Sequence, residues 1–308
     1  MSSPSFEHVS VLLEEAVDAL APRSGGLYCD GTLGGAGHSR RILERSSPDG
    51  RLIAVDRDHT ALEAARATLA PFGDRVTFVH GTFGELPALV AQPVDGVLVD
   101  LGVSSPQLDR AERGFSFRRE GPLDMRMDQT SGETARELCD RLSVDELADL
   151  IRLYGDERYA GRIARTIKEA IDAGALHTTT ELAARIADIV PSRERSKDPA
   201  TRTFQALRIA VNDELGEVER LLEALPGLLA PGGRAAVIAF HSLEDGLVKR
   251  RFREWSKEPN VPADLIDVMG LSRPTFRALT RKPIEPSDTE VQRNPRSRSA
   301  KLRVAEKL

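Results

Sequence analysis

Residues 95–109 read "DGVLVDLGVSSPQLD" and bring together groups that can hold an amine. The apolar run Val97–Val99 ends at Asp100, and Ser104–Pro106 follow shortly after it. A carboxylate and backbone carbonyls fixed by a proline ring can accept both hydrogens of an amine and aim its lone pair at a methyl group. Such a transfer depends on placement, which can supply about 7–11 kcal/mol of a barrier, more than on a general base, which is worth about 10²–10⁴-fold. The simpler alternative is that Asp100 caps a loop and Pro106 turns it.

A glycine-rich stretch after an earlier apolar run has the composition of a ligand loop. Residues 29–39 read "CDGTLGGAGHS", and their glycines let the backbone approach a ligand closely at the positive end of a helix. The stretch fails the G-x-G-x-x-G dinucleotide pattern, because the third position counted from Gly35 and Gly37 is Arg40. An enzyme that uses a nicotinamide dinucleotide is therefore disfavoured. The alternative is a turn rich in glycine that binds nothing.

Asp56 offers the second half of a nucleoside site. It ends the next apolar run, 19 residues after Gly37, where a carboxylate can accept hydrogen bonds from both hydroxyls of a ribose. A ribose carboxylate without a pyrophosphate loop predicts an adenosine ligand that lacks a diphosphate, and S-adenosyl-L-methionine is the commonest of these. Phe83, in "GTFGEL", is then a candidate contact of the adenine. The alternatives are a surface carboxylate at Asp56 and a core side chain at Phe83.

The elements that must position these groups alternate along the chain from residue 27. Short apolar runs separated by helical patterns are typical of an α/β fold with a doubly wound, mainly parallel sheet. The predicted strands are 27–31, 51–56, 76–81, 95–102, 234–242, 274–280 and 300–306.

The middle of the chain shows helical patterns with no strand among them. Amphipathic helices are predicted over 143–155, 158–174 and 178–191, with capping boxes at Ser143 and Glu146 and at Thr178 and Glu181, and a further helix over 202–225. We therefore predict an inserted all-helical subdomain, 109–200, between two parts of the sheet domain, 1–108 and 201–308. It is expected to lie over the carboxyl edge of the sheet, where open α/β proteins bind ligands.

Composition limits the classes of protein and of partner. The 308 residues are 40% hydrophobic and 30% charged, which is ordinary for a soluble globular enzyme. Neither a leader nor a membrane span is indicated, so we expect a cytoplasmic protein. Two cysteines make a disulfide framework improbable, and no two of the six histidines share a metal-ligand spacing, so no metal is expected. The net charge is −5, yet 273–303 holds nine basic and three acidic residues, which indicates either a nucleic-acid contact or a solvated tail.

Several of these stretches together resemble a known family. "DGTLGGAGHS", "VDRD", "DLGVSSPQLDRAERGFSFRREGPLDMRMD", "YGDERYAGRIARTI", "RTFQALRIAVNDEL", "AFHSLED" and "NPRSRSAKLR" are similar to the bacterial ribosomal RNA small-subunit methyltransferase H family, also called MraW. The resemblance covers nearly the whole chain, from about residue 8 to residue 303. It implies a Rossmann-like class I methyltransferase that uses S-adenosyl-L-methionine to methylate N4 of a cytidine in the decoding region of 16S rRNA, near the P site.

The resemblance also implies roles for individual residues. The family's cofactor contacts fall on Ala36, Gly37, His38, Asp56, Phe83, Asp100 and Gln107. Ala36 departs from the family, in which many relatives have glycine. If Asp100 contacts the cofactor, Ser104, Ser105 and Pro106 become the better candidates for holding the cytosine amine. They resemble the S-P-P loop of cytosine-N4 methyltransferases that act on DNA, with Gln107 in place of the second proline. Ser105, Pro106 and Asp100 are therefore the predicted catalytic residues.

Basic and aromatic side chains are the candidates for binding 16S rRNA, which we expect within the 30S subunit. A flipped cytosine can stack on an aromatic ring, and cations can contact phosphates. The candidates are Phe115, Arg162, Arg165, His241, Arg296, Arg298 and Lys301. Alternatively, Phe115 and Phe117 pin their loop to the core and His241 is structural. The competing functions are a small-molecule methyltransferase with a helical lid and a non-catalytic ribosome assembly factor. A monomer and a homodimer are equally open.

Overall fold

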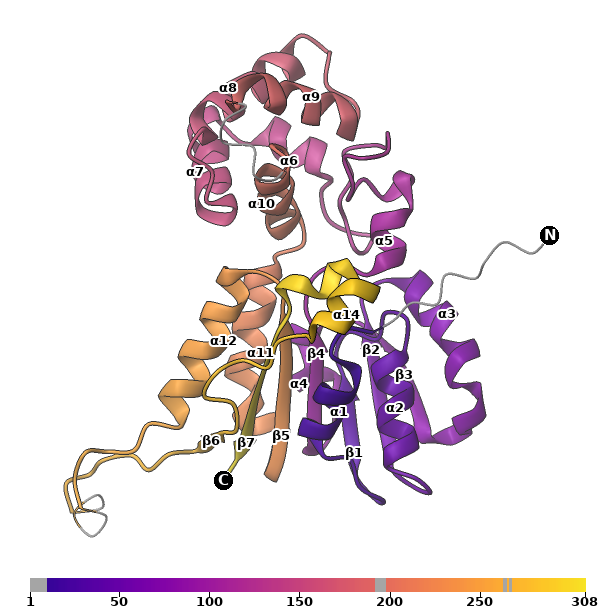
Figure 1. Ribbon diagram of the computed structural model, residues 1–308, viewed down its shortest axis with the longest axis vertical. Helices are drawn as coiled ribbons and strands as arrows, with labels where there is room; N and C mark the ends of the chain where they lie inside the picture. The colour runs from indigo at the N-terminus through magenta and orange to yellow at the C-terminus, as the bar shows by residue number, and fades with distance from the viewer. Residues whose placement is uncertain (1–9, 192–197, 263–264, 266–267) are drawn as a thin grey trace. The chain divides into compact units, whose positions relative to one another are not determined.

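The fold is described from a computed structural model of residues 10–191, 198–262, 265 and 268–308. Contacts within the chain divide it into two compact units (Figure 1). We call Met1–Gly102 with Leu215–Leu308 the sheet unit, and Val103–Glu214 the helical unit. The helical unit is longer at both ends than the predicted insertion, 109–200, because its core includes Leu108 before that range and Phe204 and Leu207 after it.

The sheet unit is built on one seven-stranded sheet, and all seven predicted strands are present. Its order is β3-β2-β1-β4-β5-β7-β6. Neighbours from β3 to β5 pair in parallel, whereas β7 is antiparallel to both β5 and β6. The strands are β1 (Leu27–Asp30), β2 (Arg51–Asp56), β3 (Val76–His80), β4 (Val94–Asp100), β5 (Leu229–Ala239), β6 (Phe276–Ala278) and β7 (Lys301–Lys307). The prediction of a doubly wound, mainly parallel sheet is confirmed.

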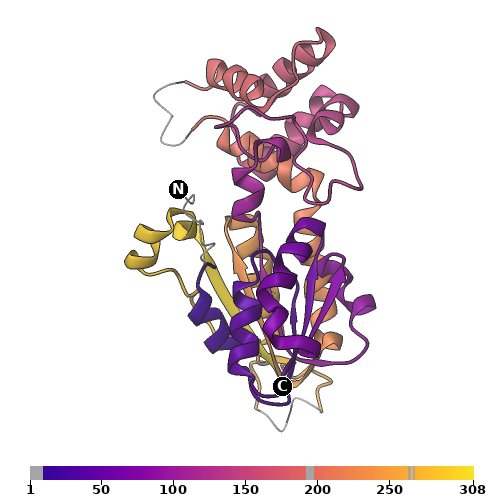
Figure 2. The same cartoon turned by 90° about the vertical axis from the view of Figure 1, so that its right-hand side faces the viewer.

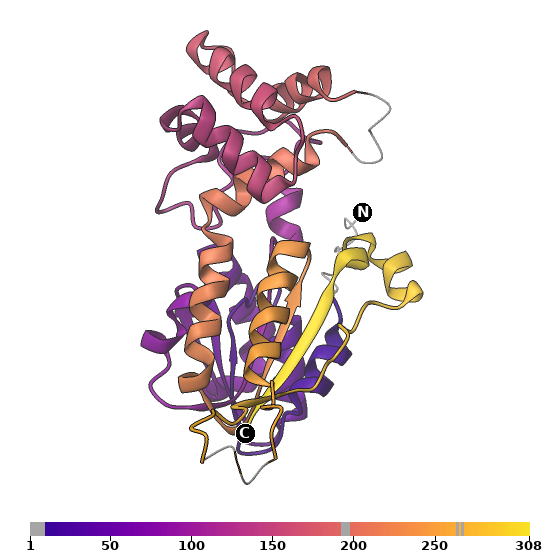
Figure 3. The ribbon, with the colours of Figure 1, turned by 90° about the vertical axis from the view of Figure 1, so that its left-hand side faces the viewer.

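Helices cover both faces of this sheet because side chains alternate along its strands. Leu98 faces a core shared with α1, α2 and α3, whereas Val97 and Val99 face a core shared with α4, α11 and α12. Figure 2 and Figure 3 view the sheet unit from its two sides, and Figure 3 shows α11 and α12 next to each other. The helices of this unit are α1 (Leu13–Leu20), α2 (Gly37–Arg45), α3 (His59–Leu69), α4 (Leu86–Leu89), α11 (Glu214–Leu228), α12 (Ser242–Trp255) and α14 (Asp288–Arg293), with 3₁₀ turns at Ala70–Arg75, Phe83–Glu85 and Pro295–Ser299.

The helical unit has a hydrophobic core of its own. Ile151, Ile163, Leu182 and Phe204 come from four of its helices and are buried together. Both predicted capping boxes are present, at the starts of α7 and α9. Its helices are α5 (Ser105–Asp109), α6 (Ala135–Arg141), α7 (Val144–Gly155), α8 (Ala160–Asp172), α9 (Thr179–Ile189) and α10 (Thr201–Val211), with a 3₁₀ turn at Ala111–Arg113.

The prediction of a single helix over 202–225 is wrong, because the chain forms two helices there, α10 and α11. Asp213 adopts the left-handed conformation at φ 49°. Asn212 accepts from the Met127 amide and donates to the Met125 carbonyl, both at 2.7 Å. These distant contacts satisfy the end of α10, so the helix stops although the amphipathic pattern continues.

Strand β5 begins earlier than the predicted range 234–242 and contains the Pro-Gly-Gly sequence at 231–233. Its pairing with β4 jumps from Leu229 to Arg234, so 230–233 bulge out of the ladder. Gly232, at φ 77°, provides the conformation that the bulge needs. Both cysteines are buried free thiols. Among the helices described, none combines the length and apolar character that crossing a membrane requires.

Candidate active site

Three carboxylates lie at the carboxyl end of the sheet because parallel strands end there together. Asp30, Asp56 and Asp100 are the last residues of β1, β2 and β4. β1 lies between β2 and β4 in the sheet, so Asp30 is the middle member of this row. The carboxyl ends of parallel strands are where α/β proteins of this architecture bind ligands.

Asp56 is held by the backbone of two loops. Its Oδ2 accepts a hydrogen bond from the Gly34 amide and its Oδ1 from the Asp58 amide, each at 2.8 Å. Burial nevertheless raises the pKa of this carboxyl group, against the lowering effect of the two amides. Because each oxygen keeps a further lone pair, the fixed carboxylate suits a pair of neighbouring hydroxyls such as those of a ribose.

The loop after β1 reaches α2 through a strained residue. Ala36 is the N-cap of α2 and lies in the left-handed region, at φ 63° and ψ 16°. Residues other than glycine are disfavoured there by about 1–2 kcal/mol. Alanine at position 36, where many relatives have glycine, therefore lowers the stability of the fold. At Gly37, a Cβ atom would come within 2.1 Å of the Ser10 hydroxyl oxygen. A larger residue at 37 would therefore require Ser10 to shift, whatever else approaches the loop.

Asp100 differs from Asp56 because one of its oxygens has no partner. Its backbone amide donates to Thr32 Oγ1 at 2.6 Å. Its Oδ1 is buried without a hydrogen bond among the described residues, and its Oδ2 lies 3.9 Å from Nδ1 of His38. Burial, followed by the negative charges of Asp30 and Glu244, raises the pKa of the Asp100 carboxyl group well above its usual value. A cation or a hydrogen-bond donor at this oxygen would relieve that cost.

His38 is fixed by the segment before α1. Its ring is buried, and Nε2 donates to the Val11 carbonyl at 3.0 Å when that nitrogen carries the proton. Phe83 packs over the start of the glycine loop, since a Cβ atom on Gly31 would lie 2.9 Å from the Cβ of Phe83. Its side chain is half-buried at the rim of one sheet core, which leaves both predicted roles for Phe83 open.

Asp30 and Glu244 are site residues that we did not predict. Asp30 is fully buried and accepts from Ser39 Oγ at 2.7 Å and from the Thr32 amide at 3.1 Å, which fixes the glycine loop. Burial raises the pKa of Asp30 to about 6. Its position as the last residue of a strand that runs into a glycine loop was the available signal.

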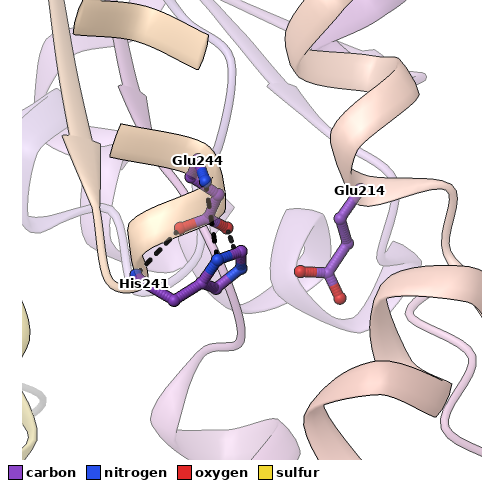
Figure 4. Close-up of side chains that lie close together, drawn as sticks. All are labelled: Glu214, His241 and Glu244. Carbon is purple, nitrogen blue, oxygen red and sulfur yellow. Dashed lines mark hydrogen bonds and ion pairs between the residues drawn. The ribbon is translucent and has the colours of Figure 1, made fainter. Parts of the chain in front are cut away.

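Glu244 is buried at the start of α12, where it accepts from the Phe240 amide at 2.9 Å. The ring of His241 lies against it and caps the helix through Nδ1 (Figure 4). Nε2 of His241 is 3.1 Å from Glu244 Oε1 but is not aligned for a hydrogen bond. This geometry favours the structural interpretation of His241. Glu214, also drawn in Figure 4, belongs to the helical unit and pairs there with Arg208 at 2.7 Å.

The predicted amine-binding residues form the start of a short helix, where a loop had been expected. Ser104 is the N-cap of α5, Ser105 and Pro106 are its first two residues, and Gln107 completes a capping box. The Ser104 amide donates to Gln107 Oε1 at 3.0 Å. Gln107 is buried, and its side-chain oxygen is used inside the helical unit. The S-x-x-Q spacing was the overlooked signal of a helix start.

The predicted RNA-binding residues have different surroundings. Phe115 is 7% exposed and lies in the core of the helical unit, and Phe117 packs edge-on against Phe204 at 5.0 Å. Both placements favour the interpretation that these rings pin their loop. Exposed positions are found for Arg162, Arg165, Arg296 and Arg298, whereas Lys301 is half-buried with its Nζ 3.7 Å from Asp245.

The strand order, the antiparallel β7, the glycine loop after β1 and the acidic end of β2 define the class. The chain is a class I S-adenosyl-L-methionine-dependent methyltransferase. The donor set fits the cofactor: Asp56 suits its ribose hydroxyls, and the unpartnered oxygen of Asp100 suits one of its cationic or N–H groups.

Comparison with known proteins gives the family. A family model described as the MraW methylase family matches residues 5–308, and the chain belongs to that family. It is 54% identical to a protein of Sorangium cellulosum, over 98% of this chain and 91% of that protein. It is 52% identical to one of Geobacter sulfurreducens, over 99% and 100%, and 50% identical to one of Magnetococcus marinus, over 99% of each. Each of these three relatives is named ribosomal RNA small subunit methyltransferase H.

A solved rRNA methylase of Streptococcus thermophilus aligns over 97% of this chain and 98% of its own, at 11% identity and a TM-score of 0.45.

Proposed function

We propose that this chain methylates N4 of a cytidine in the decoding region of 16S rRNA, with S-adenosyl-L-methionine as methyl donor and the 30S subunit as substrate. The observation that carries this proposal is the full-length identity of 50–54% with methyltransferases named for small-subunit rRNA. The row of carboxylates independently supports the choice of methyl donor. A substrate of this kind also makes the cytoplasm the expected location.

Bound S-adenosyl-L-methionine supplies an electrophilic methyl group on a sulfonium sulfur. Asp56 would hold the nucleoside through two hydroxyls, and its own position is fixed by the Gly34 and Asp58 amides. Asp100 presents a carboxylate oxygen that has no partner among the described residues and that a donor or cation of the ligand would satisfy. The protein thereby contributes alignment, which can supply about 7–11 kcal/mol of a barrier.

Holding the cytosine amine is the role that we assign to Ser105 and Pro106. Pro106 is exposed at the second position of α5, and its ring fixes the backbone direction there. Backbone and hydroxyl oxygens at this turn can accept the amine hydrogens and leave the nitrogen lone pair free. The amine proton becomes acidic once nitrogen is methylated, so water suffices to remove it.

A methyl-transfer experiment tests the proposal. Labelled S-adenosyl-L-methionine is incubated with unmethylated 30S subunits, deproteinised 16S rRNA and DNA, and the nucleosides of each product are separated by mass spectrometry. N4-methylcytidine is expected from the 30S subunits. Cofactor binding without any transfer to these substrates would overturn the proposal and favour an assembly factor or a small-molecule methyltransferase.

Two substitutions separate the assigned roles. Pro106→Ala is expected to lower kcat about 10-fold or more, within the range that misplacement of a reacting group costs, while the Kd for S-adenosyl-L-methionine stays unchanged. Asp100→Asn is expected to weaken cofactor binding itself. A Pro106→Ala variant that loses cofactor affinity and keeps kcat would refute the assignment.

A further inference from the structure

Helix α12 and the residues directly after it carry a row of exposed cations on the sheet unit. Residues 249–257 read "KRRFREWSK", with five basic side chains and one acidic. Lys249, Arg250, Arg253 and Lys257 are all exposed, and we call them the α12 stripe. With Gly246 and Glu254 they line a groove of about 380 Å³. The spacing of Lys249, Arg250 and Arg253 places them on one side of the helix, and Lys257 follows two residues after the last helical residue, Trp255.

The stripe residues lack the acidic partners that other arginines of the same unit have. In the described part of the chain, none of the four forms an ion pair or a hydrogen bond. By contrast, the α2 arginines Arg40, Arg41 and Arg45 each pair with Glu14, Asp18 or Glu44. Like charges three and four residues apart on a helix repel one another. Folding alone therefore gives no reason for this arrangement, and an anionic partner does.

The opposite side of α12 is firmly anchored, so the stripe is presented on a fixed support. Val248 and Phe252 are buried in the sheet core. Asp245 is buried and accepts from Arg303 of β7 at 2.6 Å. A partner that binds the stripe orders side chains only, since the helix is already in place.

We propose that the α12 stripe binds the sugar-phosphate backbone of the substrate rRNA outside the target nucleotide, an inference that rests on the proposed function. The helix rise of 1.5 Å per residue separates Lys249 from Arg253 by about 6 Å along the axis, and Lys257 lies beyond the last residue of the helix, Trp255. A nucleic-acid strand with a rise of about 3.4 Å presents about two phosphates over the helical part of the stripe, and Lys257 extends the row of cations beyond it. The four cations of the stripe therefore suit a short row of phosphates.

The helix's aromatic side chains argue for phosphates and against bases as the contact. Phe252 and Trp255 stack on each other, with ring centroids 5.9 Å apart, and Trp255 stacks on Phe276 at 4.5 Å. These rings are used inside the sheet unit. The stripe therefore offers charge without a stacking surface, which is the property of a sequence-independent backbone contact.

The position of the stripe along α12 determines which property it affects. The helix begins directly after His241, at the carboxyl edge of the sheet. Lys249 and Arg253 lie about 12 and 18 Å further along the axis at 1.5 Å per residue. We therefore expect the stripe to set rRNA affinity and to leave cofactor binding and the chemical step unchanged.

The test compares two variants with the same change in net charge. The stripe variant carries Lys249→Gln, Arg250→Gln, Arg253→Gln and Lys257→Gln. The control variant carries Arg23→Gln, Arg45→Gln, Arg141→Gln and Arg152→Gln, four exposed arginines that pair with carboxylates. Binding to deproteinised 16S rRNA and to unmethylated 30S subunits is titrated over a range of KCl concentrations, with the Kd for S-adenosyl-L-methionine and the melting temperature of each variant.

Each result decides the proposal. We expect the stripe variant to bind rRNA about 10-fold or more weakly and to lower the slope of log K against log salt by about 2–3, as for the loss of three or four phosphate contacts. Its cofactor Kd and its kcat on saturating 30S subunits should match those of the wild type. Unchanged rRNA affinity and slope would overturn the proposal, and so would equal losses in the control variant. The proposal would also be overturned if the stripe variant kept its rRNA affinity and lost binding only to vesicles of anionic lipid or to an acidic protein.

Two further outcomes separate this inference from the proposed function. Wild-type protein that binds rRNA through the stripe without methylating it would remove the proposed function and leave the phosphate contact. Wild-type protein that binds no small-subunit rRNA would remove both. If the fourfold variant melts early, the pair Lys249→Gln and Lys257→Gln replaces it, with about half the change in slope expected.

Discussion

Asp56 and Asp100 end strands of the same sheet, yet their surroundings are opposite. Asp56 accepts two backbone amides, one on each oxygen. Asp100 has a buried oxygen with no partner among the described residues, and two acidic neighbours raise its pKa further. The first carboxylate is prepared for neutral hydroxyls, whereas the second is prepared for positive charge. The two carboxylates can thus bind different polar groups of one ligand.

The largest expected effect is on Asp100. Asp100→Asn should weaken S-adenosyl-L-methionine binding about 100-fold, because it removes a charge-assisted contact. Calorimetric titration with S-adenosyl-L-methionine and S-adenosylhomocysteine checks this. An equal loss of affinity for both ligands would mean that their shared amino group lies at Asp100. A loss of affinity for S-adenosyl-L-methionine alone would mean that the sulfonium lies there. Unchanged affinity for both would remove the distinction between the two carboxylates.

A pH dependence accompanies this effect. Because the pKa of Asp100 is raised in the free protein and a bound cation favours the ionised form, binding releases a proton. Affinity should therefore fall as pH drops below that raised pKa, by up to about 10-fold per pH unit for one linked proton. The Asp100→Asn variant should lack this decline. The same titrations at several pH values check it, and an identical decline in the variant would contradict it.

The next effect concerns Asp30, which lies between the two. Its pKa of about 6 is above the ordinary value, so its contribution to stability is present below about pH 4 and is lost as pH rises through 6. Asp30→Asn should gain about 2–3 kcal/mol in free energy of unfolding relative to wild type between pH 4 and pH 8. Urea unfolding across that range checks this. Asp49→Asn is the control. Hydrogen bonds lower the pKa of the Asp49 carboxyl group, so this variant should show no such gain.

A smaller effect is expected at Asp56. Asp56→Asn keeps one acceptor oxygen but turns an amide NH₂ toward one of the two backbone donors, so cofactor affinity should fall about 10-fold. Calorimetric titration with S-adenosyl-L-methionine checks this, and an unchanged affinity would contradict it.

The smallest effect is at the loop beside Asp56. Ala36→Gly relieves a left-handed alanine, which costs about 1–2 kcal/mol, and loses part of that gain to the entropy of the unfolded chain. A net stabilisation of about 0.5–1 kcal/mol is expected in thermal or urea unfolding. Gly37→Ala is the contrasting variant and should destabilise, because Ser10 fills the space of its Cβ atom.

The sheet and its carboxylates were predictable because they depend on local pattern. Alternating apolar runs placed all seven strands, and parallel pairing brings their acidic ends to one edge. Asp56 and Asp100 followed from being last in their runs. Asp30 occupied the same kind of position and was missed because its strand ends directly in glycines.

Other features depend on contacts between distant residues. The end of α10 is decided by Asn212, whose partners lie more than 80 residues earlier, so an amphipathic pattern could not show it. Phe115 and Phe117 have similar sequence neighbours, and only the packed core of the helical unit shows how each is buried. The ligand contacts of Ser105, Pro106 and the exposed arginines remain predictions.

The place of β7 in the sheet has a consequence for the order in which the protein can assemble during synthesis. β7 lies between β5 and β6, and it is the only strand partner that β6 has in the described chain. It also provides Arg303, which pairs with the buried Asp245 of α12. Residues 301–307 are translated after all of these elements. While β7 is still inside the ribosomal exit tunnel, β5 has an open edge, and α12 reaches its final anchorage only after β7 emerges.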